Sequence, residues 1–191
     1  MAIDLVKRGL PHSSPLQDAD AFSAFYERTH LNVFRYASAI LGGQTDAEDV
    51  TAEAYMRAWK ARDSFSGDED AAKGWLFTIT RNCIFDRGRR QSTKQPALPM
   101  DDAIADTLAD AGPTIDDVLV TSEQREEVFA LVRALPEPQR EILVLRYVMD
   151  WRVNQIAAHL SLTENAVSVH IHRAVQRLQR SLLPAQEVTH D

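Results

Sequence analysis

The chain has 191 residues, 45% of them hydrophobic and 26% charged, and a formal net charge of -7 at pH 7. This length allows one medium domain or two small ones, each with its own core. No run reaches the roughly 18 apolar residues of a membrane span, and the N-terminus lacks the apolar core of a signal peptide. The single cysteine, Cys83, cannot form an internal disulfide. We therefore expect a cytoplasmic protein rather than a membrane or secreted one.

The first two helices follow from apolar spacing. Apolar and small residues recur at three- and four-residue steps from Phe22 to Ile40, a period that predicts an amphipathic helix ending at Gly42. Thr45 and Glu48 have the spacing of a capping box, so we expect Thr45 to be the N-cap of the second helix. The buried stripe predicted for that helix consists of small residues: Val50, Ala54, Ala58 and Ala61.

A third helix is predicted after a polar loop at residues 63–70. The helix covers residues 74–91, with Leu76, Ile79 and Cys83 directed inward. Three large aromatic residues in this segment lead into a basic cluster that is unusual for an acidic protein. These residues are Trp75, Phe77 and Phe85, followed by Arg87, Arg89, Arg90 and Lys94.

The acidity of the chain is concentrated in its middle. Residues 95–121 contain six aspartates and no lysine or arginine, several Pro and Gly residues, and few large apolar side chains. We therefore expect a flexible acidic linker, with a short helix over residues 103–109. The predicted organisation is a tail at 1–19, a helical domain at 20–94, the linker at 95–121, a second helical domain at 122–183 and a tail at 184–191.

The C-terminal part is predicted to end in a helix-turn-helix. After the break at Leu135-Pro136 comes an apolar stripe, then a short helix over 153–160, a three-residue turn at 161–163 and a longer helix for which Thr163 is a good N-cap. The stripe predicted to be buried on the last helix is Val167, Ile171, Ala174, Val175, Leu178 and Leu182. The fold class is therefore all-α, with two small helical domains.

In this order, the two halves resemble the extracytoplasmic-function sigma factors of bacterial RNA polymerase, which belong to the sigma-70 family. The resemblance rests on DAEDVTAEAYMRAW at 46–59 and WLFTITRNCIFDRGRRQ at 75–91 for region two. For region four it rests on ALPEPQREILVLRY at 134–147 and IAAHLSLTENAVSVHIHRAVQRL at 156–178. Each motif alone is moderately specific, but both blocks joined by an unstructured linker make a strong signal.

The resemblance implies that region two recognises and melts the minus-ten element of a promoter. A pocket capturing a flipped base of the non-template strand recovers part of the cost of unstacking it, and arginines beside the pocket hold phosphates. The implied residues are Ser64, Phe65, Ser66, Gly67, Asp68, Trp75, Arg81, Asn82, Arg87, Arg89 and Arg90. The alternative is that the aromatic residues belong to the core and the arginines to a solvated helix end.

Region four, by the same resemblance, reads the minus-thirty-five element with the first turns of its last helix in the major groove. The implied residues are Arg152, Thr163, Glu164, Asn165, Ser168, Val169, His172 and Arg173. Relatives often carry Lys or Arg where this chain has Ser168 and His170. Because fewer cations release fewer counterions, we expect this domain to bind DNA weakly outside the polymerase complex.

The resemblance also implies protein partners: the clamp helices of the largest polymerase subunit, the flap region, and an anti-sigma factor. Opposite charges on an acidic helix and on basic clamp helices raise the rate at which the two proteins associate and orient them for docking. The implied polymerase-binding residues are Asp46, Glu48, Asp49, Glu53, Met56 and Trp59. The alternative is an ordinary solvated face.

Two other functions remain open at this stage. A sigma-like decoy would occupy an anti-sigma factor without touching DNA, and a helix-turn-helix repressor would use the first domain for dimerisation. No glycine-rich phosphate loop, catalytic triad spacing or metal-ligand cluster is apparent in the sequence. We therefore expect no enzyme activity, no cofactor, no metal and no membrane insertion.

Overall fold

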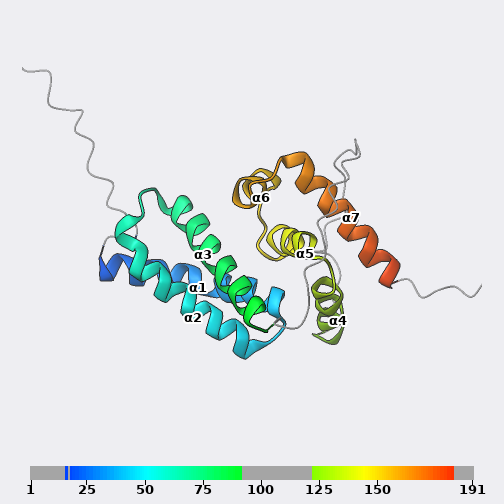
Figure 1. Ribbon diagram of the computed structural model, residues 1–191, viewed down its shortest axis with the longest axis horizontal. Coiled ribbons are helices and arrows are strands. Elements are labelled where there is room, and N and C mark those ends of the chain that lie inside the picture. Colours follow the sequence, from blue (N-terminus) through cyan, green and yellow to red (C-terminus); the bar gives the residue numbers. More distant parts are fainter. Residues whose placement is uncertain (1–15, 17, 92–121, 183–191) are drawn as a thin grey trace, which may run out of the picture.

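The computed structural model describes residues 16, 18–91 and 122–182, and every regular element in these ranges is helical. The predicted helix over 103–109 lies outside the described residues. Helices on the N-terminal side are α1 (Ala19–Leu41), α2 (Gln44–Ala61), the short 3₁₀ turn η1 (Arg62–Ser64) and α3 (Glu69–Gln91). On the C-terminal side they are α4 (Ser122–Arg133), α5 (Glu137–Leu143), the π-helical turn η3 (Val144–Val148), α6 (Val153–Leu160) and α7 (Glu164–Leu182). The all-α prediction is confirmed (Figure 1).

Local signals set the ends of α1. Asp18 is its N-cap, and the Asp18 carboxylate accepts a hydrogen bond of 2.8 Å from the Ala21 N–H. Gly42 ends the helix in the left-handed conformation, with φ of 77°, and its N–H donates to the Ser38 carbonyl. The expected N-cap of α2 is wrong, because the helix begins at Gln44 with Gly43 as N-cap, which places Thr45 inside the first turn.

Gly42 provides a test of this arrangement. Replacing it with alanine should lower the free energy of unfolding by about 1–2 kcal/mol, because an L-residue is strained at positive φ. A Cβ at this position would also lie 2.6 Å from the Arg133 Nε atom of α4. Gly74→Ala is the matched control: nothing lies within 4 Å of a Cβ there, and alanine in a helix interior should stabilise by about 0.5–1 kcal/mol. The two free energies of unfolding can be measured by urea titration. If both variants changed in the same direction, the left-handed conformation assigned to Gly42 would be contradicted.

The three N-terminal helices share one core. Small residues on α2 let it approach α1 and α3 closely, and Ala54 and Ala58 have no exposed surface. Cys83 is 1% exposed and burial raises its pKa to about 11, so the thiol is a small buried hydrophobe, as its position on the inward stripe predicts. The largest fully buried side chains of this bundle are Leu16, Phe25, Val33, Tyr36, Val50 and Leu76.

The C-terminal helices form the predicted helix-turn-helix. α6 covers Val153–Leu160 as expected, and Ser161 ends it with a left-handed φ of 56°. Thr163 caps α7, since its hydroxyl accepts a hydrogen bond of 3.1 Å from the Ala166 N–H. Val167 and Ala174 are fully buried on the side of α7 that faces α5 and α6, but the expectation for Leu182 is wrong, because its side chain is 55% exposed.

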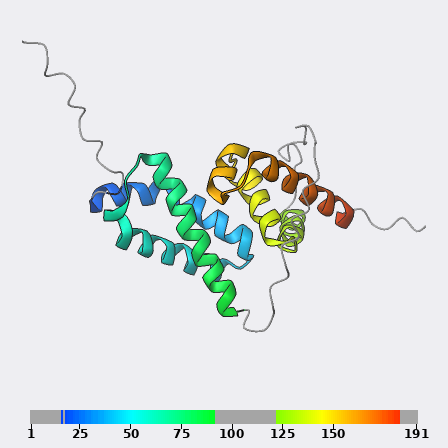
Figure 2. The same cartoon turned by 45° about the horizontal axis from the view of Figure 1, so that its top comes forward.

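The two halves lie directly against each other. The turn η3 packs on α1, and α4 contacts the end of α1, so that a single cluster of buried residues runs from Phe25 through Leu145 to Val167 (Figures 1 and 2). The expectation that each half has a separate core is therefore incomplete. Periodicity within a helix shows that one face is buried, but it does not show which helix covers that face.

Candidate nucleic-acid and protein interfaces

The loop before α3 is fixed by hydrogen bonds to the backbone of the two helices that flank it. The Ser64 hydroxyl donates to the Ala61 carbonyl at 2.7 Å, and the Asp68 carboxylate accepts from the Ala71 N–H at 2.8 Å and caps α3. The loop is shorter than predicted, since α3 already begins at Glu69. Exposed polar groups remain on its surface at Ser64, Ser66, Gly67 and Asp68.

The aromatic residues of this region have different environments. The Phe65 and Trp75 rings lie 5.2 Å apart between centroids, both half-buried, and join the loop to the first turns of α3. Phe77 is 4% exposed and belongs to the core, so the core alternative is correct for that residue. Phe85 is half-buried, with the Arg81 guanidinium 4.5 Å above its ring.

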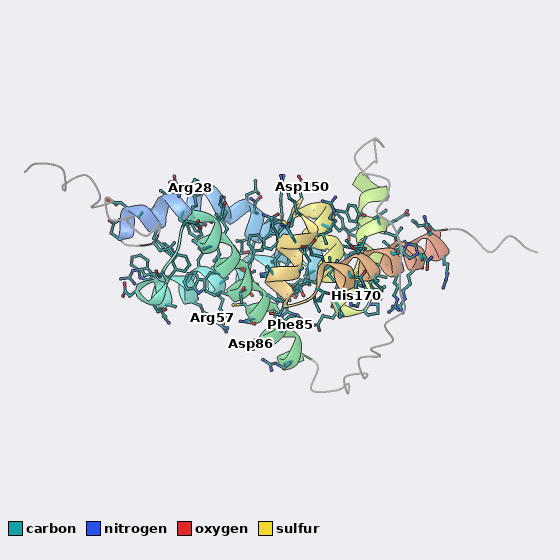
Figure 3. The ribbon with its side chains drawn as sticks, turned by 90° about the horizontal axis from the view of Figure 1, so that it is seen from above. Arg28, Arg57, Phe85, Asp86, Asp150 and His170 are labelled. Atoms are coloured by element: carbon teal, nitrogen blue, oxygen red, sulfur yellow. The ribbon has the colours of Figure 1, made fainter. Side chains whose placement is uncertain are left out.

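The second half of α3 has an exposed polar face that ends in the basic residue Arg89. Asn82 and Arg89 are seven residues apart, so they share a face of the helix, and both are exposed. Arg89 donates to Asp86, whose other oxygen accepts from Arg57 of α2 at 3.0 Å (Figure 3). These hydrogen bonds, first from Arg89 and then from Arg57, hold the pKa of Asp86 below its ordinary value.

Arg81 and Arg87, two other arginines predicted for minus-ten contact, are already paired within the protein. Arg87 pairs with Asp46 and with Asp49, two residues predicted to bind polymerase, and these hydrogen bonds raise the Arg87 pKa. Arg81 binds Glu141 of α5 at 2.8 Å. Arg90 lies in α3, but its side chain is outside the described part of the structure. Among the described arginines of the predicted minus-ten set, Arg89, with 79% of its side chain exposed, is the most accessible to a phosphate.

The exposed face of α2 has an apolar centre beside acidic groups. Met56 is 58% and Trp59 37% exposed, and Glu48 is also exposed. Glu53 pairs with Arg57, so its charge is partly neutralised. The Trp59 ring is held by Phe22, at 5.0 Å between centroids, and by the Arg62 guanidinium, 3.8 Å from its centroid. This preorganisation suits an anchor residue of a protein interface.

The sequence prediction did not include the aromatic residues of α1 that border this face. Tyr26 is 43% exposed, packs edge-on against Tyr55 at 4.7 Å and stacks on His30 at 5.1 Å. The one signal in the sequence is the four-residue spacing of Phe22 and Tyr26 on α1. That spacing could not distinguish an outer surface from the core.

The predicted minus-thirty-five residues lie together on the start of α7. Glu164, Asn165, Ser168 and His172 are exposed at helical spacing, whereas Val169 and Arg173 are half-buried beside them. Thr163 caps the helix, so its side chain is committed to the backbone. Arg152 is exposed at the N-cap of α6, and its backbone N–H donates to the Gln155 side chain at 2.9 Å.

The His172 ring is oriented by its own helix. The Gln176 side chain lies 2.8 Å from the His172 Nε2 atom, so a Gln176 amide N–H can donate to that nitrogen. In that tautomer Nδ1 carries the proton and is available as a donor to a base edge or phosphate.

The described ranges contain neither a cluster of metal ligands nor a helix that could span a membrane. Those residues contain no group of three or more His, Cys, Asp or Glu side chains that could hold a metal ion. None of the described helices is long and apolar enough to span a lipid bilayer.

Both halves of the chain match known protein families. The family model for sigma-70 region 2 matches residues 25–94, and that for sigma-70 region 4 matches residues 125–178. The ECF RNA polymerase sigma factor SigL of Mycobacterium tuberculosis is 28% identical over 172 residues, covering 86% of this chain and 90% of SigL. SigW of Bacillus subtilis is 28% identical over 174 residues, with the same two coverages.

Solved structures share the fold over most of this chain. CnrH, in complex with the cytosolic domain of CnrY, superposes with a TM-score of 0.61 at 24% identity, covering 86% of this chain and 89% of CnrH. RpoE of Bartonella quintana, in complex with the anti-sigma factor NepR, gives a TM-score of 0.60 at 21% identity, covering 83% of this chain and 94% of RpoE.

Proposed function

The chain belongs to the sigma-70 family, and on this premise we propose that it is an extracytoplasmic-function sigma factor that brings core RNA polymerase to specific promoters and helps to melt them. The observation that carries this proposal is the match of both family models, in order, to the two helical halves of one chain. A helix-turn-helix alone would fit many regulators, whereas the pair of regions fits transcription initiation.

Promoter melting is assigned to the polar face of α3 and the loop before it. Asn82 is proposed to bind the flipped minus-ten base, with the exposed groups of residues 64–68 on the other side of the pocket. Arg89 and Arg90 are proposed to hold the adjacent phosphates. Support comes from the shared face and exposure of Asn82 and Arg89.

Minus-thirty-five recognition is assigned to the start of α7. Asn165, Ser168 and His172 are proposed to meet base edges in the major groove, and Arg152 and Arg173 to meet the backbone. The carboxylate of Glu164 is suited to accept from a cytosine amino group. Because the base-facing set carries little positive charge, affinity is proposed to come from the polymerase-bound complex as a whole.

Polymerase docking is assigned to the exposed face of α2. Met56 and Trp59 are proposed to be its apolar anchors, and Glu48 its most available carboxylate. Asp46, Asp49 and Glu53 are proposed to add negative potential, although each is paired with an arginine of its own domain. The flap region of the polymerase is proposed to bind region four.

The mode of action and control follow from the same premise. We propose a cytoplasmic factor without enzyme activity, because the relatives are transcription initiation factors. We propose control by a separate anti-sigma factor, since RpoE of Bartonella quintana is known in complex with one.

Run-off transcription tests the proposal. The purified full-length chain, added to core polymerase and a library of random promoter fragments, should yield discrete transcripts that core polymerase alone does not make. A decoy that only sequesters an anti-sigma factor would give none, and neither would a repressor. The absence of transcripts, together with DNA binding in the absence of polymerase, would replace the proposal with the repressor.

A further inference from the structure

An exposed row of side chains runs along α7 from Glu164 to Gln176. Glu164, Ser168, His172 and Gln176 lie four residues apart and are all exposed, so they adjoin one another along the helix. From Glu164 to His172 the row extends about 12 Å, at 1.5 Å per residue. Zinc-finger helices read three successive bases with a row of similar length. His172 is therefore placed to meet a base pair about two pairs from the one that faces Glu164.

The last member of the row holds the imidazole ring of His172. The side-chain nitrogen of Gln176 lies 2.8 Å from the His172 Nε2 atom. An amide NH2 group can only donate a hydrogen bond, so Nε2 accepts, and the proton of the neutral ring lies on Nδ1. The ring nitrogen that is left for other contacts is therefore a donor.

Neighbouring charges favour this orientation of the Gln176 amide. Arg173 and Arg180 lie three residues before and four residues after Gln176, the spacings at which side chains adjoin on a helix. Guanidinium groups have N–H donors and no acceptor, so they favour the amide oxygen and leave the NH2 end for the ring. Glu164 is the only acidic residue of α7 and lies two turns before His172, so no carboxylate of this helix competes for the Nδ1 proton.

A donor at this position distinguishes the four bases. Guanine presents two adjacent acceptors, N7 and O6, in the major groove, whereas cytosine presents only an amino donor. Adenine and thymine each offer one acceptor, which lies beside an amino group in adenine and beside a methyl group in thymine. A ring with its proton on Nδ1 therefore fits guanine best and cytosine worst. The opposite tautomer would present an acceptor and would reverse the order of these two bases.

We propose that Gln176 is a positioning residue that acts through His172 and makes this contact of the row selective for guanine. The inference rests on the proposed function of α7 in minus-thirty-five recognition, and it names the base for one contact of that site. Gln176 fixes which ring nitrogen carries the proton, and the ring meets the base. Selectivity at this base pair is thus set by a side chain one helical turn beyond the residue that contacts DNA.

The tautomer can be tested without DNA or polymerase. Nitrogen-15 NMR of the full-length chain at about pH 8, where an ordinary imidazole is neutral, distinguishes a protonated ring nitrogen from an unprotonated one. His172→Ala identifies the signals of His172 among those of the six histidines. We expect the proton on Nδ1 in the unaltered chain and a mixture of both tautomers in Gln176→Ala. A proton on Nε2 in the unaltered chain, or the same tautomer in both proteins, would overturn the inference.

Base preference is the second test, measured with the complex of core polymerase and the full-length chain. Promoters selected by run-off transcription are changed one base pair at a time in the minus-thirty-five element. The pair at which His172→Ala removes the preference is assigned to the ring. There the unaltered chain should prefer guanine to cytosine by about fivefold, the effect of one hydrogen bond, and Gln176→Ala should reduce the ratio to about twofold or less. The ratios at the other pairs should not change.

Two lysine variants separate positioning from charge. Gln176→Lys keeps a donor for Nε2, so it should preserve the guanine preference of the unaltered chain. Its added charge should raise affinity for all promoters equally, as Gln179→Lys should, because phosphate contacts carry no sequence information. Gln179 is the matched position, since it is exposed on the same helix but lies about 10 Å along the axis from His172. A preference that survived in Gln176→Ala, or was lost in Gln176→Lys, would contradict the positioning role.

The two measurements separate failure of this inference from failure of the proposed function. If the ring carries its proton on Nδ1 but the chain initiates no promoter-specific transcription, the sigma-factor function fails while the orientation of His172 by Gln176 stands. If transcription is promoter-specific and Gln176→Ala changes no base preference, the positioning role fails while the function stands.

Discussion

Replacing Asn82 and Arg89 together with alanine should slow open-complex formation about 100-fold. Asn82 is exposed on the same face of α3 as Arg89, where its amide can capture a flipped base, and Arg89 can hold the next phosphate. Each captured base contributes about 1–3 kcal/mol, and a lost phosphate contact also reduces the salt dependence of binding. The rate can be followed with a fluorescent base analogue in the minus-ten element.

The fold should survive this double change. Asp86 keeps its partner Arg57 when Arg89 is removed, and neither replaced side chain is buried. Arg28→Ala is a matched control, since this arginine of α1 is also exposed and ion-paired, to Glu69, and is labelled far from Asp86 in Figure 3. Polymerase affinity should be unchanged in both variants. Unaltered opening by the double variant would remove region two from promoter melting.

Replacing Met56 and Trp59 with alanine should weaken binding to core polymerase by about 2–4 kcal/mol, or about 30- to 1,000-fold in Kd. Both side chains are large and exposed on α2, and the Trp59 ring is already held by Phe22 and Arg62, so little ordering is needed on binding. Affinity can be measured by titrating a labelled full-length chain with core polymerase.

Two controls separate this effect from unfolding or loss of charge. Leu31→Ala removes a comparable exposed apolar side chain from α1 and should leave the affinity within about twofold, as expected for a surface change outside an interface. Glu48→Gln should mainly lower the association rate, more at low salt than at high salt. A double variant that is fully folded and binds polymerase normally would move the docking surface away from α2.

In α3, helical spacing accounts for some of the buried positions and tertiary contacts account for the others. Apolar spacing predicted the buried positions of Leu76 and Cys83 correctly. It did not distinguish Phe77, which is buried, from Trp75, which is half-buried, because the core on that side comes partly from Trp151 of the other half. Aromatic residues in a basic segment suit both nucleic-acid binding and packing, and tertiary contacts decide between them.

The ion-pair partners of the arginines also depend on tertiary contacts. The basic cluster was apparent from composition, but the partners of its arginines were not. Arg87 pairs with Asp46, 41 residues away, while Arg89 pairs with Asp86 three residues away. The second kind of pair is set by the helical repeat and can be predicted from spacing, whereas the first depends on how two helices pack.

The helical character of both halves, the turn at 161–163, the Thr163 cap and the family could all be predicted before the structure, because hydrogen bonds between near neighbours and a 3.6-residue period leave marks along the chain. Three features became apparent only from helix packing: the two halves share a core, Glu141 is buried against Tyr36 and Arg81, and Arg89 is the most exposed described arginine of its cluster. Those contacts join residues up to 105 positions apart, where no periodic pattern connects the partners.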